Sequence, residues 1–386
     1  MAATKSGTAA KVLDALLKAA IALPICTLPA KAGQLETANG GIKYLNYAEG
    51  DGRIDVNSPL LWFQGPLAQN YDIALSATLD SVSGASPQYV SNQSGKPVHT
   101  LSGASIIENR RAADVKVTRY LGNMSLGATA SVSSEHDYLS RGAGIDMRFD
   151  FNNKLTTLAL GSGVTSDDVG SSIDRSLHEQ RLSHDFLIGI TQIINPLSLV
   201  QSNLSFSEGQ GYYNDPYKFT LFFFPGSPAP VLHRDIRPDR RRQTAWLTRY
   251  RRFFPAWESA LAVDYRYYAD DWGVRAHTLD FSWSKNFGHG WKLRPGLRYY
   301  SQRQADFYGT VFSSSSGVGS SDERLGSFGA LAPSLKVSKE LSADTSLDVA
   351  VGYYRQEAKY KAGGGGSSDL APFSARYLML GLNRQF

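Results

Sequence analysis

Apolar and polar side chains alternate along most of the chain after residue 32. Between residues 257 and 267, one set of alternate positions holds Leu261, Val263 and Tyr265, and the other holds Asp264 and Arg266. Successive side chains of a β-strand face opposite sides, so residues two apart share a surface. The pattern recurs at 71–80, 114–117, 124–132, 145–151, 278–284, 291–302, 331–338 and 346–356. It predicts an all-β chain whose strands have one apolar and one polar face.

The connections between these segments favour a membrane barrel over a soluble β-sandwich, which also alternates. Short connections fall at 65–70, 121–123, 152–154, 195–196, 254–256, 288–290 and 341–345. Between them lie longer ones at 83–107, 167–177, 211–239, 304–327 and 358–372, and tight ones near 51–52 and 270–273. Bacterial barrels combine short periplasmic turns with longer outer loops and an even strand number. We therefore expect a transmembrane antiparallel up-and-down β-barrel of about sixteen strands.

The last segment carries the most specific signal for such a barrel. Leu378, Leu380, Leu382 and the terminal Phe386 share one face of the predicted final strand. An alternating apolar strand that ends in an aromatic residue resembles the C-terminal signal that the barrel-assembly machinery reads. Arg384 departs from that pattern, but a charge near the membrane interface costs only about 0–1 kcal/mol. We expect Phe386 to act as an assembly signal and this machinery to be a partner during biogenesis.

The first 32 residues have the features of a cleavable signal peptide. Lys5 and Lys11 precede an apolar stretch at 13–30, and small residues surround Lys31 at the expected cleavage site. The stretch is too short and too broken for a transmembrane helix. Two alternatives stay open: a buried amphipathic helix, or a lipoprotein signal at Cys26, although Ile25 stands where a small residue is expected. The predicted organisation is a signal peptide at 1–32 and a barrel at 33–386.

Charge and cysteine content exclude several functional classes. Residues 1–32 hold four lysines and one aspartate, so they carry +3 of the net +5 and leave +2. So small a charge is not that of a nucleic-acid-binding protein. The one cysteine lies in the predicted signal peptide, so the mature chain would have neither disulfides nor thiolate metal sites. We expect no cofactor.

Four short stretches resemble a widespread family of proteobacterial outer-membrane proteins that is known only as a domain of unknown function. They are DGRI at 51–54, DSVSGASP at 80–87, RRAAD at 110–114 and SEHDYLSRG at 134–142. The resemblance covers essentially the whole mature chain. It implies a barrel in the outer membrane of a Gram-negative bacterium, without an agreed activity. It also suggests a periplasmic redox context, with a lipoprotein or redox protein as an alternative partner.

Two groups of residues contain the side chains of a possible enzymatic or metal site. Ser134, His136 and Asp137 are neighbours in one predicted strand, so a catalytic triad would need partners from other strands. His178 and His184 share a face but lie roughly 20 Å apart along a strand, too far for one ion. Polar residues near a rim explain both groups more simply. The sequence therefore predicts neither an enzyme nor a metal site, and an outer-membrane lipid hydrolase is only the third functional alternative.

The polar face is the best candidate for a functional surface, because charges facing lipid would be expensive. We expect these residues to line a water-filled pore: Asp264, Arg266, Asp280, Lys292, Arg294, Arg298, Lys336 and Asp348. A barrel of about sixteen strands has room for such a channel. The leading hypothesis is a porin-like channel for small hydrophilic solutes. The alternative is a non-conducting barrel that serves as scaffold or conduit for the periplasmic partner.

Two further segments bear on the pore and on the membrane. Apolar side chains in the long connection at 211–239 should not all face water, so we expect them to form a constriction loop in the lumen or to pack along the outer leaflet: Phe219, Phe222, Phe223 and Phe224. The arginines at 240–242, 249, 251 and 252 lie on both faces of one segment. Contact with outer-membrane lipid and lipopolysaccharide phosphates explains part of this run, and steering of a substrate is the alternative.

Overall fold

The computed structural model describes residues 34–84, 87–93, 96–101, 106–313 and 317–386. The predicted signal peptide lies outside these residues, so its division from the barrel at residue 32 stays a prediction. Among the residues that the structure describes, no helix has the length and hydropathy to cross a membrane. The only helical elements described are single 3₁₀ turns at Pro255–Trp257, Glu323–Leu325 and Ala358–Tyr360.

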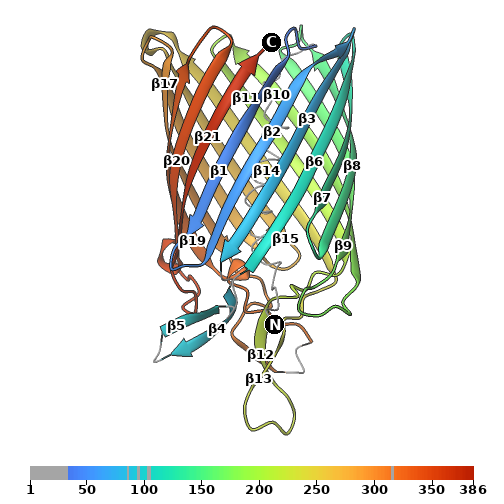
Figure 1. Cartoon of the computed structure of the whole chain (residues 1–386), viewed down its shortest axis with the longest axis vertical. Coiled ribbons are helices and arrows are strands. Elements are labelled where there is room, and N and C mark those ends of the chain that lie inside the picture. Colours follow the sequence, from blue (N-terminus) through green and yellow to red (C-terminus); the bar gives the residue numbers. More distant parts are fainter. Residues whose placement is uncertain (1–33, 85–86, 94–95, 102–105, 314–316) are drawn as a thin grey trace.

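Sixteen of the described strands form one closed antiparallel barrel, as the alternation predicted (Figure 1). Each pairs with the barrel strand before and after it along the chain, and the last pairs with the first. The strands are β1 (Asn39–Glu49), β2 (Ile54–Ala68), β3 (Tyr71–Gly84), β6 (Ile106–Leu121), β7 (Met124–Ser134), β8 (Tyr138–Phe151), β9 (Thr156–Val169), β10 (Glu179–Asn195), β11 (Ser198–Gly211), β14 (Arg240–Phe254), β15 (Ser259–Asp270), β16 (Arg275–Asn286), β17 (Trp291–Arg303), β19 (Phe328–Glu340), β20 (Thr345–Glu357) and β21 (Phe373–Gln385).

The outside of the barrel is apolar because one set of alternate positions faces outward. Val263, Phe281 and Leu297 lie side by side on three neighbouring strands, and Phe281 and Leu297 are 47% and 48% exposed. A soluble protein rarely exposes a continuous band of such side chains. Near one end of the barrel, Phe254 stacks on Trp257 and Trp283 at 5.6 and 5.3 Å between ring centroids. This cluster suits the aromatic girdle of a membrane interface.

The final strand closes the barrel. β21 pairs with both β20 and β1, and the Phe386 backbone N–H donates to the Ala38 carbonyl oxygen at 2.8 Å. Leu378, Leu380 and Leu382 face outward. Arg384, the departure from the terminal pattern, lies 3.6 Å from Asp344. The strand is thus placed as its sequence predicted, whereas the role of Phe386 in assembly stays a prediction.

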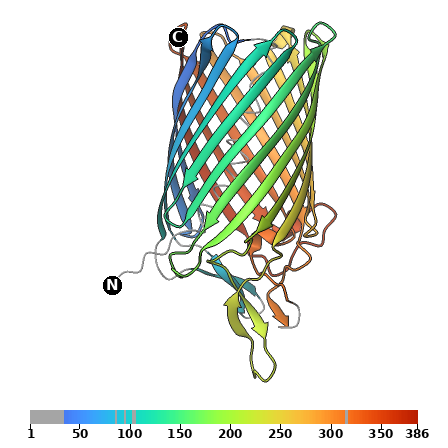
Figure 2. The same ribbon diagram turned by 90° about the vertical axis from the view of Figure 1, so that its right-hand side faces the viewer.

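The two ends of the barrel differ in their connections (Figures 1 and 2). At one end, here the turn end, tight turns join the strands, and several use left-handed backbone at Asn or Gly, such as Asn70 and Gly122. The opposite end, here the loop end, carries the long connections. This division confirms the predicted alternation of short and long connections.

One predicted strand segment is a turn instead. Residues 135–137 form a tight connection between β7 and β8, in which the Glu135 N–H donates to the Tyr138 carbonyl oxygen at 2.8 Å. Asp137 contacts the hydroxyl group of Tyr217 in another loop. The interpretation of Ser134–His136–Asp137 as strand neighbours was therefore wrong, because polar residues at a strand end satisfied the alternation equally well.

Two small sheets lie beyond the loop end of the barrel. β4 (Pro87–Gln93) and β5 (Lys96–Leu101) form a hairpin inside the β3–β6 connection. β12 (Phe219–Phe223), β13 (Val231–Arg234) and β18 (Val311–Ser313) form the other sheet, which joins the β11–β14 and β17–β19 connections. Figures 1 and 2 both show β12 and β13 projecting away from the barrel.

Candidate functional site

The inside of the barrel carries the polar set of alternate positions. On β17, Leu293 and Leu297 face outward, so Lys292, Arg294 and Arg298 face the lumen. Cross-strand partners share a face, and Asp280 on β16 is opposite Arg298. By the same registers, all of the residues predicted to line a pore are on the inward face: Asp264, Arg266, Asp280, Lys292, Arg294, Arg298, Lys336 and Asp348.

Inward-facing charges are sorted between two opposite walls of the lumen. The wall of β14 to β20, here the basic wall, carries Arg241, Arg249, Arg251, Arg266, Lys292, Arg294, Arg298 and Lys336, with Asp264, Asp270, Asp280, Glu340 and Asp348. The wall of β3 to β10, here the acidic wall, carries Asp72, Asp80, Glu108, Asp114, Asp146, Asp150, Asp167, Glu179 and Asp185, with Arg110, Lys116, Arg148 and Arg181. Opposed walls of unlike charge produce a field across the lumen.

Most ion pairs of the lumen run along a wall. On the basic wall, Arg298 Nε lies 2.6 Å from Asp280 Oδ1, and Lys336 Nζ lies 2.8 Å from Asp348 Oδ2. On the acidic wall, Arg110 Nε lies 2.6 Å from Asp80 Oδ2. All three pairs join neighbouring strands. Pairs of this kind neutralise charges locally and do not fill the centre of the lumen.

Three cations of the basic wall stand apart from these pairs. Within the part of the chain that the structure describes, Arg266, Lys292 and Arg294 have no carboxylate within ion-pair distance. All three are exposed although they face inward. Arg266 lies over the Tyr268 ring at 5.9 Å, and Arg294 Nε donates to Ser282 Oγ at 3.1 Å. The basic wall therefore offers accessible positive charge to the lumen.

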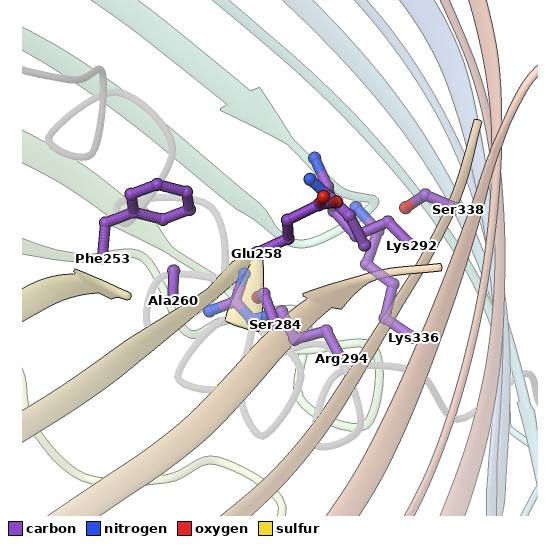
Figure 3. A pocket seen from close by; sticks show the side chains of 9 residues that line it. Phe253, Glu258, Ala260, Ser284, Lys292, Arg294, Lys336 and Ser338 are labelled. Atoms are coloured by element: carbon purple, nitrogen blue, oxygen red, sulfur yellow. The ribbon is translucent and has the colours of Figure 1, made fainter. Parts of the chain in front are cut away.

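A cavity of about 420 Å³ lies on the basic wall toward the turn end. Lys292 and Arg294 from β17 and Lys336 from β19 reach into it, and Glu258 borders it from the turn before β15 (Figure 3). Glu258 has a left-handed backbone with φ of 45°, which is uncommon for a residue other than Gly or Asn. We call this space the turn-end cavity. Its lining also includes the polar side chains Ser284, Asn286 and Ser338.

The β17–β19 connection folds into the mouth at the loop end. Gln302, which faces inward, donates through Nε2 to the carbonyl oxygens of Arg324 and Gly326 at 2.9 and 2.6 Å. Leu325 is buried against Trp272 and Val274 of the tight β15–β16 turn. Arg324 and Leu325 close one side of a second cavity, of about 230 Å³, which is otherwise lined by wall residues such as Arg266.

Buried ion pairs fix this inserted segment, residues 322–326, which we call the cap. Asp215, Asp235 and Asp322 are 2%, 1% and 1% exposed. Arg237 lies 2.7 Å from Asp235 through Nε and 2.9 Å from Asp322 through Nη2. Arg324 Nη2 lies 2.7 Å from Asp215 and also pairs with Asp322. The network joins the β11–β14 connection to the β17–β19 connection.

The pKa values of these carboxyls follow from their surroundings. Burial alone would raise the pKa of Asp322, but Arg324, Lys218 and Arg237 hold it well below its usual value. Burial raises the pKa of Asp235, and the attraction of Arg237 does not offset it. Asp322 is therefore the ionised centre of the network. Two arginines held on one buried carboxylate make a rigid joint.

The cap bridges several neighbouring strands at the loop end of the barrel. It contacts β17 through Gln302, and Glu323 Oε1 lies 2.5 Å from Arg53 Nη2 in the β1–β2 turn. Between β17 and that turn lie β19, β20 and β21. A segment that contacts both must span part of the mouth. Sequence periodicity does not predict this contact; the one local signal is the charge cluster of Asp322, Glu323 and Arg324 in a loop otherwise rich in Ser and Gly.

The aromatic segment predicted to form a constriction lies elsewhere. Phe219, Phe222 and Phe223 belong to β12, outside the barrel, and Phe224 follows it. Phe222 is 2% exposed and packs against Phe224, His233 and Phe312, with ring centroids 5.6–6.3 Å apart. Packing within its own sheet covers Phe222, whereas Phe223 and Phe224 are 46% and 39% exposed, and the segment does not constrict the lumen. The cap, and not this segment, lies across part of the loop end of the barrel.

The other candidate sites do not assemble among the described residues. No group of three or more metal-ligating side chains occurs there. His184 and Asp185 are successive strand residues and therefore face opposite sides of β10. His178 precedes that strand. In the turn at 135–137, the His136 backbone N–H donates to Glu108 Oε1 of β6 at 3.0 Å, which is a structural contact between this turn and the neighbouring strand.

Comparison with known proteins places the chain in a family and in a fold class. A family model described as "Protein of unknown function (DUF3570)" matches residues 13–380. No curated protein matches the sequence. Among solved structures, CdiB from Acinetobacter baumannii has a TM-score of 0.54 at 8% identity, over 90% of this chain and 60% of that chain. A bacterial polysaccharide outer membrane secretin has a TM-score of 0.50 at 9% identity, over 91% and 98%.

A looser likeness links the chain to the CymD monoaromatic hydrocarbon channel, with a TM-score of 0.44 at 9% identity. The alignment covers 100% of this chain and 95% of that one. The present chain thus spans about three fifths of the CdiB chain and nearly all of the other two. At such identities the likeness shows the fold alone, which is that of an outer-membrane β-barrel.

Proposed function

We propose that this chain, which belongs to the DUF3570 family of proteins of unknown function, is an outer-membrane channel that passes small hydrophilic solutes. The proposal rests on the inward face of the barrel. Arg266, Lys292 and Arg294 face inward, are exposed and have no carboxylate partner among the described residues. Charged groups in a dry interior would carry a large desolvation cost. Water in the lumen removes that cost.

The arrangement of the ion pairs favours a channel over a plugged scaffold. In a barrel sealed by its own side chains, opposite walls would pair across the centre. Here Arg298–Asp280 and Lys336–Asp348 pair along one wall. The cap narrows the mouth at the loop end, so we expect it to limit solute size.

We further propose that the barrel lies in the outer membrane with its turn end toward the periplasm. Short turns on the periplasmic side and long loops outside are the general rule for such barrels. Outward-facing charges near the loop end support this orientation. Glu208 lies between Arg240 and Arg242, and Arg141 pairs with Asp168 at 2.9 Å. These groups would meet the phosphates and cations of lipopolysaccharide.

Conductance of the purified protein in a planar bilayer tests the channel. We expect stepwise increases in ion current as single proteins insert. The variant Arg324→Ala, which should loosen the cap, keeps the test decisive if the wild-type mouth is closed. A protein that never conducts, with or without this substitution, would contradict the proposal and would favour a scaffold for a periplasmic lipoprotein or redox partner.

A further inference from the structure

We infer that the turn-end cavity is a binding station for a small oxyanion with two or more carboxylate or phosphate groups. The inference rests on the proposed channel and names the class of solute that the channel favours. Lys292 and Arg294 supply positive charge with no carboxylate partner among the described residues. Lys336 adds a third cation at the same cavity. Its pairing with Asp348 leaves its side chain 36% exposed.

The donors around the cavity suit an oxyanion better than chloride. Arg294 uses its Nε for Ser282, so the two terminal nitrogens of its guanidinium group are available. A guanidinium group binds carboxylate and phosphate through paired hydrogen bonds. Lys292 comes from the same strand, two residues earlier, and therefore faces the same side. Figure 3 shows the side chains of Lys292 and Arg294 from β17 and of Lys336 from β19 at one cavity.

The size of the cavity sets the scale of the solute. Its volume of about 420 Å³ is near the lower end of the range for small-molecule sites, roughly 300–1,000 Å³. A di- or tricarboxylate fits such a space. Ser284 and Asn286 at the cavity can hydrogen-bond parts of the solute that the cations do not reach.

The carboxylate of Glu258 competes with a bound anion for the cations of the cavity. Its exposed side chain borders the same cavity, so its carboxylate repels a bound anion and attracts the same cations. A conducting pore must release its solute as well as bind it. An acid beside the station lowers the affinity and allows exit. The two kinds of residue should therefore act in opposite directions on anion binding.

Block of the ion current by citrate and by inorganic phosphate tests the station. Citrate on the turn-end side should interrupt the potassium chloride current, and phosphate should do so at higher concentration. Lys292→Gln and Arg294→Gln should each raise the half-blocking concentration about tenfold, the effect of losing one hydrogen bond to a charged group. Glu258→Gln should lower it. Lys285→Gln is the matched control, because Lys285 faces outward beside Leu293.

Calorimetric titration of citrate into the detergent-solubilised protein separates this inference from the channel. Binding that Lys292→Gln weakens supports the station even if no current is seen, which would refute only the proposed function. A conducting channel whose citrate block is the same in wild type, Lys292→Gln and Arg294→Gln would overturn the station but leave the channel. Absence of citrate binding in both measurements would also overturn it.

Discussion

Arginine and lysine side chains have opposite surroundings at the two ends of the lumen. At the loop end, Arg237 and Arg324 lie in a packed network, each bonded to two carboxylates that are at most 2% exposed. At the turn end, Lys292 and Arg294 are exposed and lack such partners among the described residues. Both pairs are cationic, and the burial of the side chains and their pairing with carboxylates separate their roles. The first pair holds the cap together, and the second pair is available to a solute.

Breaking the cap network should have the largest effect. Arg324→Ala would leave Asp322 and Asp215 buried with less compensating charge, at a cost of about 3–5 kcal/mol to the local stability. We expect faster hydrogen–deuterium exchange in residues 317–327 and a larger conductance, while the barrel strands stay protected. The control is Arg303→Ala, whose partner Asp306 is 64% exposed, so its exchange should match wild type. Unchanged exchange in Arg324→Ala would show that the network does not hold the cap.

A substitution in the sheet outside the barrel should destabilise that sheet to a similar extent, but it should not change the conductance. Phe222→Ala removes a buried ring, which costs about 3–5 kcal/mol where the site cannot collapse. It should increase proteolysis of the β12–β13 hairpin without changing the current. Phe223→Ala removes a ring that is 46% exposed, so proteolysis and current should both match wild type. Deletion of residues 219–230 should likewise leave conductance unchanged, and an increase would restore the constriction role that the sequence suggested.

A smaller change should come from the middle of the basic wall. Asp264 is shared by Arg249, at 3.6 Å, and by Arg251. Asp264→Asn would remove one negative charge from the basic wall and weaken the neutralisation of both arginines. We expect the ratio of chloride to potassium permeability, measured from the reversal potential in a salt gradient, to rise by about twofold. Asp168→Asn makes the same change on the outer face and should leave the ratio as in wild type. A fall in the ratio would mean that these arginines do not face the conducting path.

The smallest effect is expected at the end of the last strand. Arg384→Leu removes an exposed pair with Asp344, so the free energy of unfolding from lipid vesicles should change by about 0–1 kcal/mol. By comparison, Leu380→Arg puts a charge on the lipid-facing surface and should cost about 2–4 kcal/mol. Equal losses in urea titrations of the two variants would contradict the assignment of the outward face.

The sequence predicted the barrel well because alternation is a local signal. Leu293, Leu297 and their neighbours determine which side of β17 faces lipid, without knowledge of any distant contact. The same signal put Lys292 and Arg294 on the inward face. It failed at residues 135–137, where a polar turn continued the alternation of the strand before it.

The cap could not be predicted in this way. Its position depends on Arg237, Asp322 and Asp215, which come from two loops about a hundred residues apart in the chain and meet only in the folded protein. Composition indicated that the apolar side chains of Phe219 to Phe224 should not all face water. It does not determine whether they pack in the lumen, against lipid or in a separate sheet. Loop contacts of this kind follow from tertiary packing and not from periodicity.

We infer that one side of each barrel strand faces water and the other faces hydrocarbon. Single cysteines at Lys292, Leu293, Arg294, Leu297 and Arg298 of β17 test it, in a chain whose only other cysteine, Cys26, is replaced by serine. A charged, membrane-impermeant thiol reagent should label the protein in lipid vesicles at positions 292, 294 and 298 and spare 293 and 297. Equal labelling at all five positions, or labelling of 293 and 297 alone, would contradict a water-filled lumen.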